Sequence, residues 1–291
     1  MSIQWYPGHM TKARTVIAES MPSVDVVIEV LDARMPAASA NPVMTELRGP
    51  KPCLKVLSKS DLADPDVTQR WLRHFERNRA VLAIAITTER TSETRARIPE
   101  LCQKLAPHRK GPDKVLRAMI VGIPNVGKST LINTLMGRKV ANVGDEPAVT
   151  KAKQKVVLKS GMMLSDHPGL LWPKIEDEKA ALRLALGGAI PDTALDYENV
   201  ATFAARWFLQ RYPKLLLARY KLKELPASPA ELLEAIGRRR GALRPGGVVD
   251  VHKAADALIH DFRSGVLGRI SLEEPRSSSL RLAAPPVSTD D

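Results

Sequence analysis

The stretch Gly122-Ile123-Pro124-Asn125-Val126-Gly127-Lys128-Ser129 decides the fold of this 291-residue chain. Its spacing is G-x-x-x-x-G-K-[ST], a pattern in which successive backbone N–H groups surround phosphates. Residues 115–121 before it are apolar and β-prone, and residues 129–136 after it have helical apolar spacing that ends at Gly137. A strand, a glycine loop and a helix are the context that a phosphate-binding loop requires, so an ordinary turn is a poor interpretation.

The motif also assigns roles to its residues. The helix N-terminus adds a partial positive charge beside the phosphates, Lys128 would reach the β and γ phosphates, and Ser129 would supply a hydroxyl to Mg²⁺. We expect the nucleotide contacts of this segment to come from Gly122, Pro124, Asn125, Val126, Gly127, Lys128, Ser129 and Thr130.

A second phosphate-side motif follows the apolar run 161–165. Asp166-His167-Pro168-Gly169 has the form Asp-x-x-Gly, which predicts a carboxylate on the Mg²⁺ side at Asp166 and a γ-phosphate contact from the Gly169 N–H. Taken alone, Asp166 could equally be a helix cap or a turn residue. The loop between the two motifs contains Thr150, whose hydroxyl is a further candidate Mg²⁺ ligand, although any loop threonine would fit that description.

A candidate base-reading motif comes earlier, at Ser58-Lys59-Ser60-Asp61. It follows the strand-like run 53–57, and α/β sheets bind ligands beyond the carboxyl ends of their strands. The Asp61 carboxylate can accept hydrogen bonds from the N1–H and the amine of guanine, a donor pair that adenine lacks. The alternative is a lysine followed by a helix-capping aspartate. Ser58 replaces the usual Asn, which removes an amide that would contact the base and brace the phosphate loop.

The order of these motifs is the reverse of that in an ordinary GTPase, because the base motif precedes the phosphate loop. Circular permutation of a GTPase domain is the simplest explanation. The polar, proline-bearing stretch 107–113 would then join the original ends, since compact domains place their termini close together at the surface.

The rest of the chain predicts an α/β domain followed by an all-α domain. Strand-like runs alternate with helical stretches, which is typical of a three-layer domain with a mostly parallel sheet. We expect a permuted P-loop GTPase domain over 1–173, a helical domain over 174–274 and a disordered Ser/Pro-rich tail over 275–291. The expected strands are 24–31, 53–57, 80–86, 115–121, 154–158 and 161–165, and the expected later helices are 182–186, 200–209, 230–236 and 254–262.

With these motifs in place, the chain resembles the ribosome biogenesis GTPase A family, the circularly permuted GTPases of large-subunit assembly. The resemblance spans roughly residues 3–272. It rests on the motif order and on Trp5-Tyr6-Pro7-Gly8-His9-Met10, Val30-Leu31-Asp32-Ala33-Arg34-Met35-Pro36, Asp196-Tyr197-Glu198-Asn199-Val200 and Gly265-Val266-Leu267-Gly268-Arg269-Ile270. Besides Ser58, the departures are His167, where the family usually has Thr, and Thr87-Thr88, where its last base motif usually reads Ser-Ala.

The resemblance implies further site residues. Leu170 stands where Ras-like proteins place a catalytic Gln, so His9 becomes the candidate to orient or deprotonate water. A structural histidine is the alternative, and Lys12, Arg14 and His167 are competitors. Asn125 is expected to coordinate K⁺, unless it only supports the turn. The expected catalytic set is His9, Lys128, Thr150 and Gly169, with GTP or GDP, Mg²⁺ and K⁺ as cofactors.

Charge suggests a polyanionic partner. The chain carries a net charge of +12, and residues 206–244 hold ten Lys or Arg against three Glu, a net +7. The same segment contains Trp207, Phe208, Tyr212 and Tyr220. Basic side chains neutralise phosphates and aromatic faces stack on unpaired bases, so RNA binding is one interpretation. A helical bundle with a buried aromatic stripe and a solvated basic face is the other.

The resulting hypothesis is a monomeric GTP-hydrolysing assembly factor. It would bind the RNA and protein of a large ribosomal subunit precursor and couple hydrolysis to a late maturation step or to its own release. The two cysteines have no metal or redox spacing, and neither a signal peptide nor a membrane span is visible, so we expect a cytosolic protein without a membrane partner. The alternatives are an RNA-binding scaffold with little nucleotide turnover and an ATPase.

Overall fold

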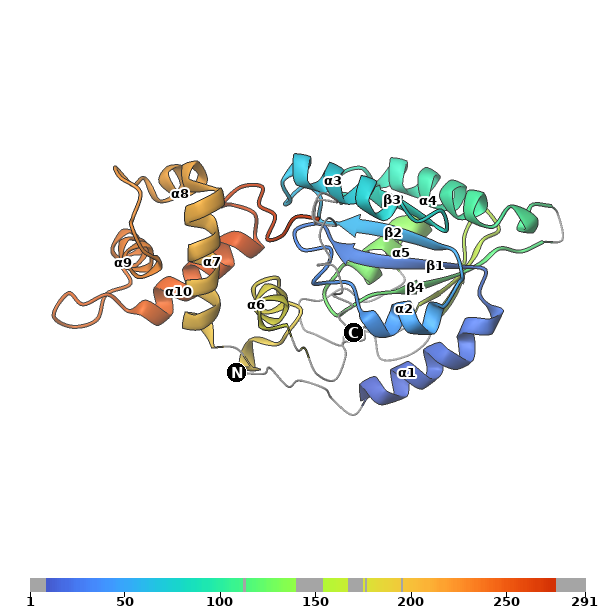
Figure 1. The fold of residues 1–291 in the computed structure, drawn as a ribbon, viewed down its shortest axis with the longest axis horizontal. Coiled ribbons are helices and arrows are strands. Elements are labelled where there is room, and N and C mark those ends of the chain that lie inside the picture. The colour runs from blue at the N-terminus through green and yellow to red at the C-terminus, as the bar shows by residue number, and fades with distance from the viewer. Residues whose placement is uncertain are drawn as a thin grey trace, which may run out of the picture.

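The structure is a computed structural model that describes residues 9–111, 114–139, 154–166, 175, 177–194 and 196–275. The side chains of residues 9–13, 154–155, 166 and 194 are not among those described. Figure 1 shows an α/β part, at the right of the view, and a helical part at the left. No helix in the described ranges is both long enough and apolar enough to cross a bilayer.

The α/β part is built on a mixed six-stranded sheet in the order β3-β2-β1-β4-β6-β5. All pairs are parallel except β5 with β6. All seven residues of β1 are buried, as expected for a parallel strand that is covered on both faces. The strands are β1 (Val26–Asp32), β2 (Cys53–Ser58), β3 (Val81–Ala85), β4 (Arg117–Val121), β5 (Gln154–Val157) and β6 (Met163–Asp166), which confirms the six predicted strands to within a few residues.

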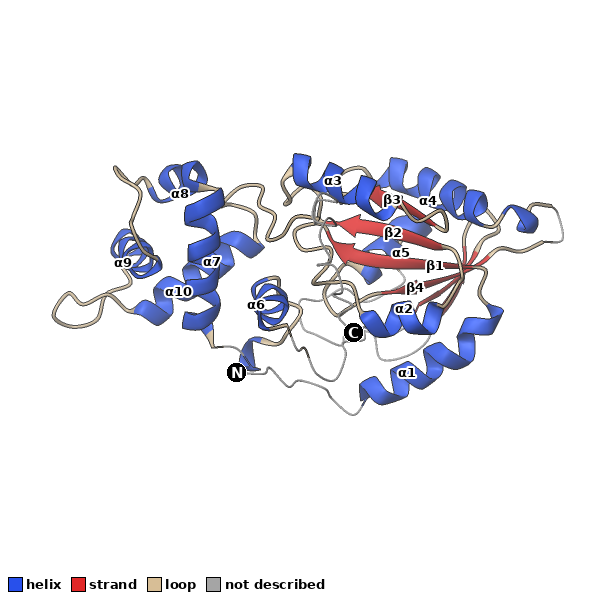
Figure 2. Cartoon of the chain, viewed as in Figure 1, coloured by secondary structure: helices blue, strands red, loops and turns tan. Residues whose placement is uncertain are grey.

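The helices of this part alternate with its first four strands along the chain, and Figure 2 colours helices and strands differently. They are α1 (His9–Ser20), α2 (Pro42–Arg48), α3 (Pro65–Phe75), α4 (Thr91–Leu105) and α5 (Lys128–Met136), with short 3₁₀ turns η1 (Met21–Ser23) and η2 (Pro107–Arg109). The chain runs outward from β1 to β3 and then returns to β4 beside β1. The carboxyl ends of β1 and β4 therefore form the switch point at which such sheets bind ligands.

The helical part contains α6 (Glu178–Leu186), η3 (Asp192–Ala194), α7 (Tyr197–Arg211), α8 (Pro213–Tyr220), α9 (Pro229–Arg240) and α10 (Val251–Arg263). Helix α7 packs against α10 and α9, and the rings of Phe208 and Phe262 stack 5.7 Å apart. The sequence prediction missed α8, a helix of eight residues that begins directly after α7 with Pro213 at its first position.

The aromatic residues of the basic segment serve the core rather than RNA stacking. Phe208 and Tyr220 are 0% and 3% exposed, so the expectation that these rings stack on bases is wrong. Trp207 and Tyr212 are partly buried and both contact Ser271, through the indole N–H at 2.9 Å and the phenol at 3.2 Å from its carbonyl oxygen. A buried aromatic stripe is therefore the correct interpretation.

After α10 the chain returns to the α/β part as a segment that we call the C-terminal strap, residues 267–274. Figure 1 shows this red segment leaving the helical part toward the sheet. The Leu272 N–H donates to the Arg34 carbonyl at 2.7 Å, and the Trp71 indole N–H donates to the Glu273 carbonyl at 3.3 Å. By sequence the strap belongs to the predicted helical domain, but these hydrogen bonds attach it to the α/β part.

Candidate nucleotide site

The phosphate loop leaves β4 after Val121 and enters α5 at Lys128, at the switch point of the sheet. Gly122 has φ of 153°, and a Cβ there would lie 2.6 Å from the carbonyl oxygen of Val30 in β1. Gly127 has φ of 100° and caps α5. Both glycines are needed for backbone reasons, and together they aim the loop N–H groups and the N-terminus of α5 at one place.

Lys128 is held inside the loop. Its side chain is 7% exposed, and its ammonium group donates to the Ile123 carbonyl oxygen at 2.8 Å. Charge at this buried position favours phosphate oxygens as partners. Ser129 and Thr130 follow in the first turn of α5, so the two hydroxyl-bearing residues of the motif begin the same helix.

The residues present fit a magnesium ion. Asp166 ends β6, which pairs with β4 so that Asp166 lies opposite Ile120, two residues before Gly122. The backbone therefore brings Asp166 to the sheet edge that carries the phosphate loop. A carboxylate and the hydroxyl of Ser129 are the oxygen donors that Mg²⁺ prefers beside phosphates.

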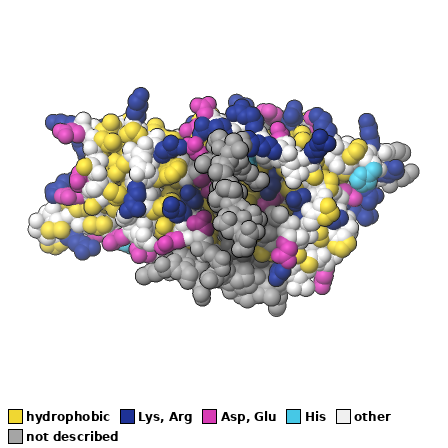
Figure 3. Space-filling model, in the orientation of Figure 1, with side chains coloured by type: hydrophobic (Ala, Val, Ile, Leu, Met, Phe, Trp, Pro, Cys, Tyr) yellow, Lys and Arg dark blue, Asp and Glu magenta, His cyan; other side chains and the backbone are white. Residues whose placement is uncertain are grey.

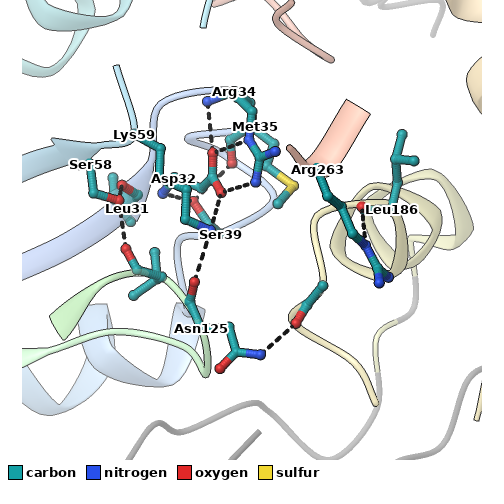
Figure 4. Close-up of polar contacts among 12 residues, drawn as sticks. Leu31, Asp32, Arg34, Met35, Ser39, Ser58, Lys59, Asn125, Leu186 and Arg263 are labelled. Carbon is teal, nitrogen blue, oxygen red and sulfur yellow. Dashed lines mark hydrogen bonds and ion pairs between the residues drawn. The ribbon is translucent and has the colours of Figure 1, made fainter. Parts of the chain in front are cut away.

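The base motif lies against the phosphate loop. Lys59 has φ of 54°, and its ammonium group donates to the Asn125 carbonyl at 2.9 Å. The Ser58 hydroxyl lies 2.5 Å from the Val126 carbonyl and 3.0 Å from that of Leu31, and its hydrogen can be donated to either (Figure 4). The expectation that serine leaves the phosphate loop without its brace is therefore wrong. The end of β2 lies so close to the phosphate loop that the short side chain of serine reaches it.

Asp61 is not the aspartate that caps the next helix. The cap of α3 is Asp64, whose carboxylate accepts hydrogen bonds from the N–H groups of Asp66 and Val67. The helix-capping role, which was the alternative for Asp61, thus belongs to Asp64. Asp61 is half-buried, in the loop that follows the carboxyl end of β2.

The loop after β3, which carries Thr87 and Thr88, is hydrogen-bonded to the loop after β2, which carries residues 58–61. The Ser60 hydroxyl and N–H both donate to the Ile86 carbonyl, at 3.0 and 3.2 Å. The Thr87 hydroxyl accepts from the N–H groups of Glu89 and Arg90 in its own loop, both at 3.2 Å, and Thr88 is exposed. The structure thus brings Ser58 and Lys59 to residues 125–126 of the phosphate loop and Ser60 to Ile86.

Sequence reasoning gave no site role to Asp32 and Arg34. Asp32 ends β1, and the Arg34 guanidinium donates to its two oxygens at 2.9 and 2.7 Å while Lys59 approaches to 3.2 Å. Burial alone would raise the pKa of Asp32, but the attraction of Arg34 and Lys59 outweighs it and holds the pKa well below its usual range. Figure 4 shows this carboxylate between the two cations. The sequence signal that could have indicated this role is an acidic residue at the end of β1, a strand at the switch point of the sheet.

Asn125 connects the phosphate loop with the helical part. Its backbone has φ of 56°, and its amide N–H donates to the Gly188 carbonyl at 2.9 Å, in the turn after α6. Arg263 of α10 holds the same turn through the carbonyls of Leu186 at 3.1 Å and Ala185 at 2.9 Å (Figure 4). The contact orients the amide so that its nitrogen faces the helical part.

Part of the predicted catalytic set is beyond what the structure describes. Thr150, His167, Gly169 and Leu170 lie outside the described residues. His9 is placed as the first residue of α1, without a described side chain. The roles given to these residues stay predictions.

Comparison with known proteins decides the family. A family model described as "50S ribosome-binding GTPase" matches residues 117–194, which include the phosphate loop and β6. A protein of Priestia megaterium named Ribosome biogenesis GTPase A is 42% identical over 282 residues, covering 94% of this chain and 98% of the relative. The chain belongs to the ribosome biogenesis GTPase A family.

Solved structures agree with this assignment. A GNP-bound structure of YlqF from T. maritima matches with a TM-score of 0.62 and 28% identity, over 90% of this chain and 98% of that one. A protein of Thermotoga maritima named Ribosome biogenesis GTPase A is 31% identical over 273 residues. Family membership confirms the permuted P-loop GTPase fold and makes this protein a GTPase, an enzyme that binds guanine nucleotides and hydrolyses GTP.

Proposed function

We propose that this GTPase binds a precursor of the large ribosomal subunit and couples GTP hydrolysis to a late maturation step or to its own release. The names of its relatives support the ribosomal partner. Besides the bacterial proteins, Mitochondrial ribosome-associated GTPase 1 of Bos taurus is 32% identical over 292 residues, covering 93% of this chain. The single observation that carries the coupling is the hydrogen bond between Asn125 of the phosphate loop and Gly188.

This contact gives nucleotide state a path to the helical part. Any shift of the phosphate loop changes the Asn125 contact with Gly188, and the turn at Gly188 is gripped by Arg263 of α10. Two packed parts that are joined through such a turn can change their positions relative to each other. GTP would favour the arrangement that docks on the particle, and hydrolysis would favour departure. The chain exit after Asp-x-x-Gly offers a second connection, which lies outside the described residues.

In this mechanism the chain itself binds and orients the phosphates. Lys128 and the loop N–H groups hold the β and γ phosphates, while Ser129 and Asp166 would hold Mg²⁺. When bound, that ion neutralises charge that develops on the phosphate oxygens. The oxygen of the Asn125 amide, opposite the nitrogen that binds Gly188, is the atom that would face K⁺.

Turnover of purified protein tests the proposal. GTP hydrolysis should rise several-fold on addition of large-subunit precursor particles, and ATP hydrolysis should stay at background.

K⁺ should accelerate GTP turnover more than Na⁺ at equal ionic strength, and Asn125→Ala should remove that difference. Phosphate release measured in both salts, with and without particles, gives the answer. GTP binding without stimulated turnover would favour the scaffold, and equal rates in the two salts would remove K⁺.

His9 is proposed as the group that orients or deprotonates the attacking water. Loss of a general base costs about 10²–10⁴-fold in rate, so His9→Ala should slow particle-stimulated hydrolysis strongly. GTP affinity should change little, because the proposed contact is to water. Single-turnover hydrolysis and nucleotide titration separate the two effects, with Glu19→Ala, an exposed residue of the same helix, as control. Wild-type turnover in His9→Ala would exclude the role.

The RNA contact is proposed for exposed cations of the helical part. Several arginines of the basic segment are committed to ion pairs: Arg219 and Arg240 both bind Asp261, which is 2% exposed, at 2.9 and 2.6 Å. Replacing Arg240 would disturb the fold before it reported on RNA. Lys214 and Lys223 are exposed and are better probes. Figure 3 shows Lys and Arg side chains over both parts on this face. Net charge alone therefore does not locate the RNA contact, and the test must compare cations at different positions.

We therefore expect Lys214→Glu with Lys223→Glu to weaken RNA or particle binding and to flatten its salt dependence. Each single-strand phosphate contact contributes about −0.7 to the log–log slope, so the double variant should lose roughly 1.4. Arg73→Glu with Arg97→Glu, at two exposed arginines of α3 and α4, makes the same charge change outside the helical part and should leave the slope near wild type. Binding titrations over a salt series measure both. An unchanged slope in the double lysine variant would move the contact surface elsewhere.

A further inference from the structure

The C-terminal strap holds the backbone of the base-reading loop. The Arg269 guanidinium donates through Nη2 to the Ser60 carbonyl and through Nε to the Ala63 carbonyl, both at 3.1 Å. One planar side chain thus spans the two ends of the segment that contains Asp61. A guanidinium can do this because its donors point in fixed directions.

The neighbours of Arg269 complete the attachment. The Ile270 N–H donates to the Leu62 carbonyl at 2.9 Å, and the Ser271 hydroxyl accepts from the Asp64 N–H at 3.2 Å. Ile270 is fully buried. Backbone groups on both sides of Asp61 are therefore hydrogen-bonded to the strap, which restricts where the Asp61 carboxylate can be placed.

The strap approaches the loop closely because one glycine precedes it and another lies within it. Gly265 has φ of 78°, and a Cβ there would lie 2.5 Å from the Leu62 side chain. Gly268 has φ of 114°, and a Cβ there would lie 2.9 Å from Leu215 of α8. The segment 265–270 is thus confined between the base loop and the helical part.

A second anchor links the strap to the other wall of the site. The Glu273 carboxylate accepts from the N–H of Ala38 at 3.0 Å, and also from that of Ala37, while Arg183 of α6 lies 3.7 Å away. Through the Leu272 hydrogen bond the strap also contacts Arg34, the residue that orients Asp32. The strap therefore touches the loops after β1 and β2 while belonging, in chain order, to the helical part.

We propose that Arg269 is a positioning residue for guanine recognition, fixing the loop that carries Asp61 from the helical side without contacting the nucleotide. The inference rests on the proposed role of residues 58–61 as the base reader. A loop held in its binding conformation loses less entropy when the base arrives. By reciprocity, guanine binding then stabilises docking of the strap on the loop, so base occupancy and the attachment of the helical part favour each other.

The test is base selectivity, measured as the ratio of Kd for IDP to Kd for GDP. Inosine lacks the exocyclic amine, so the ratio reports the hydrogen bond from that amine to Asp61. Arg269→Ala should lower the ratio about three- to tenfold, whereas a purely structural role would lower Tm and leave the ratio unchanged. Arg269→Lys should restore part of it, since an ammonium can reach one of the two carbonyls. Arg206→Ala, an exposed arginine of α7, is the matched control.

A parallel variant keeps the two ideas separable. If Asp61→Asn does not change the IDP-to-GDP ratio, the base reader itself is misassigned. If Asp61→Asn lowers the ratio and Arg269→Ala does not, the positioning role alone is overturned. Should Arg269→Ala fail to fold, hydrogen exchange of the Ile270 amide in the unaltered protein decides: GDP should slow it more than IDP, and equal slowing would overturn the role.

Discussion

Asp61→Asn should bind xanthosine triphosphate in preference to GTP. The change places an amide donor opposite the guanine amine, whereas xanthine carries a carbonyl there. Charged hydrogen bonds contribute roughly 1.5–3 kcal/mol each, so GTP binding should weaken at least about tenfold. ATP binding should remain poor. Calorimetric titration of the variant with the three nucleotides measures the crossover.

Asp64→Asn is the matched control for this experiment. Asp64 lies three residues away and caps α3, and asparagine caps helices about as well as aspartate, so its replacement should cost little stability and leave base preference unaltered. If Asp61→Asn kept its preference for GTP, the base would be read elsewhere and the assignment of Ser58, Lys59, Ser60 and Asp61 would be abandoned. Ser58→Asn should leave GTP affinity near that of the unaltered protein, because Ser58 already braces Val126.

Gly122→Ala should weaken nucleotide binding strongly. The new methyl group would lie 2.6 Å from the Val30 carbonyl, a backbone atom of the central strand β1 that cannot move aside cheaply. The phosphate loop must shift instead, away from the place where its N–H groups converge. Overpacking of this kind costs about 1–3 kcal/mol of folding free energy, and we expect GDP affinity to fall by more than about tenfold.

Gly241→Ala separates the clash from backbone strain. Gly241, which caps α9, also has positive φ, 66°, but nothing lies within 4 Å of an added Cβ. It should lose roughly 1–2 kcal/mol from the left-handed conformation and bind GDP normally. Urea unfolding and GDP titration compare the two variants. Wild-type affinity in Gly122→Ala would mean that the loop can form without its close approach to β1.

The structure explains why a base motif and a phosphate motif far apart in the chain act together. Lys59 and Ser58 bond the carbonyls of Asn125 and Val126, and these contacts exist because β2 and β4 flank β1 in one parallel sheet. From residue type alone, Ser58 was interpreted as the loss of a side chain that braces the phosphate loop. The distance from β2 to the loop, which decides whether a hydroxyl can reach, is a property of the folded sheet.

By itself the sequence determined the features that depend on chain neighbours. Apolar runs marked the six strands, the G-x-x-x-x-G-K-[ST] spacing placed the phosphate loop, and α5 ends at Gly137, as predicted. These succeed because periodicity and glycine's freedom act over a few residues. Tertiary structure alone decided the pairing of Asp32 with Arg34 and Lys59, the link from Asn125 to Gly188, and the grip of Arg269 on the base loop. Such contacts join segments whose separation is set by strand order and packing, which no local pattern encodes.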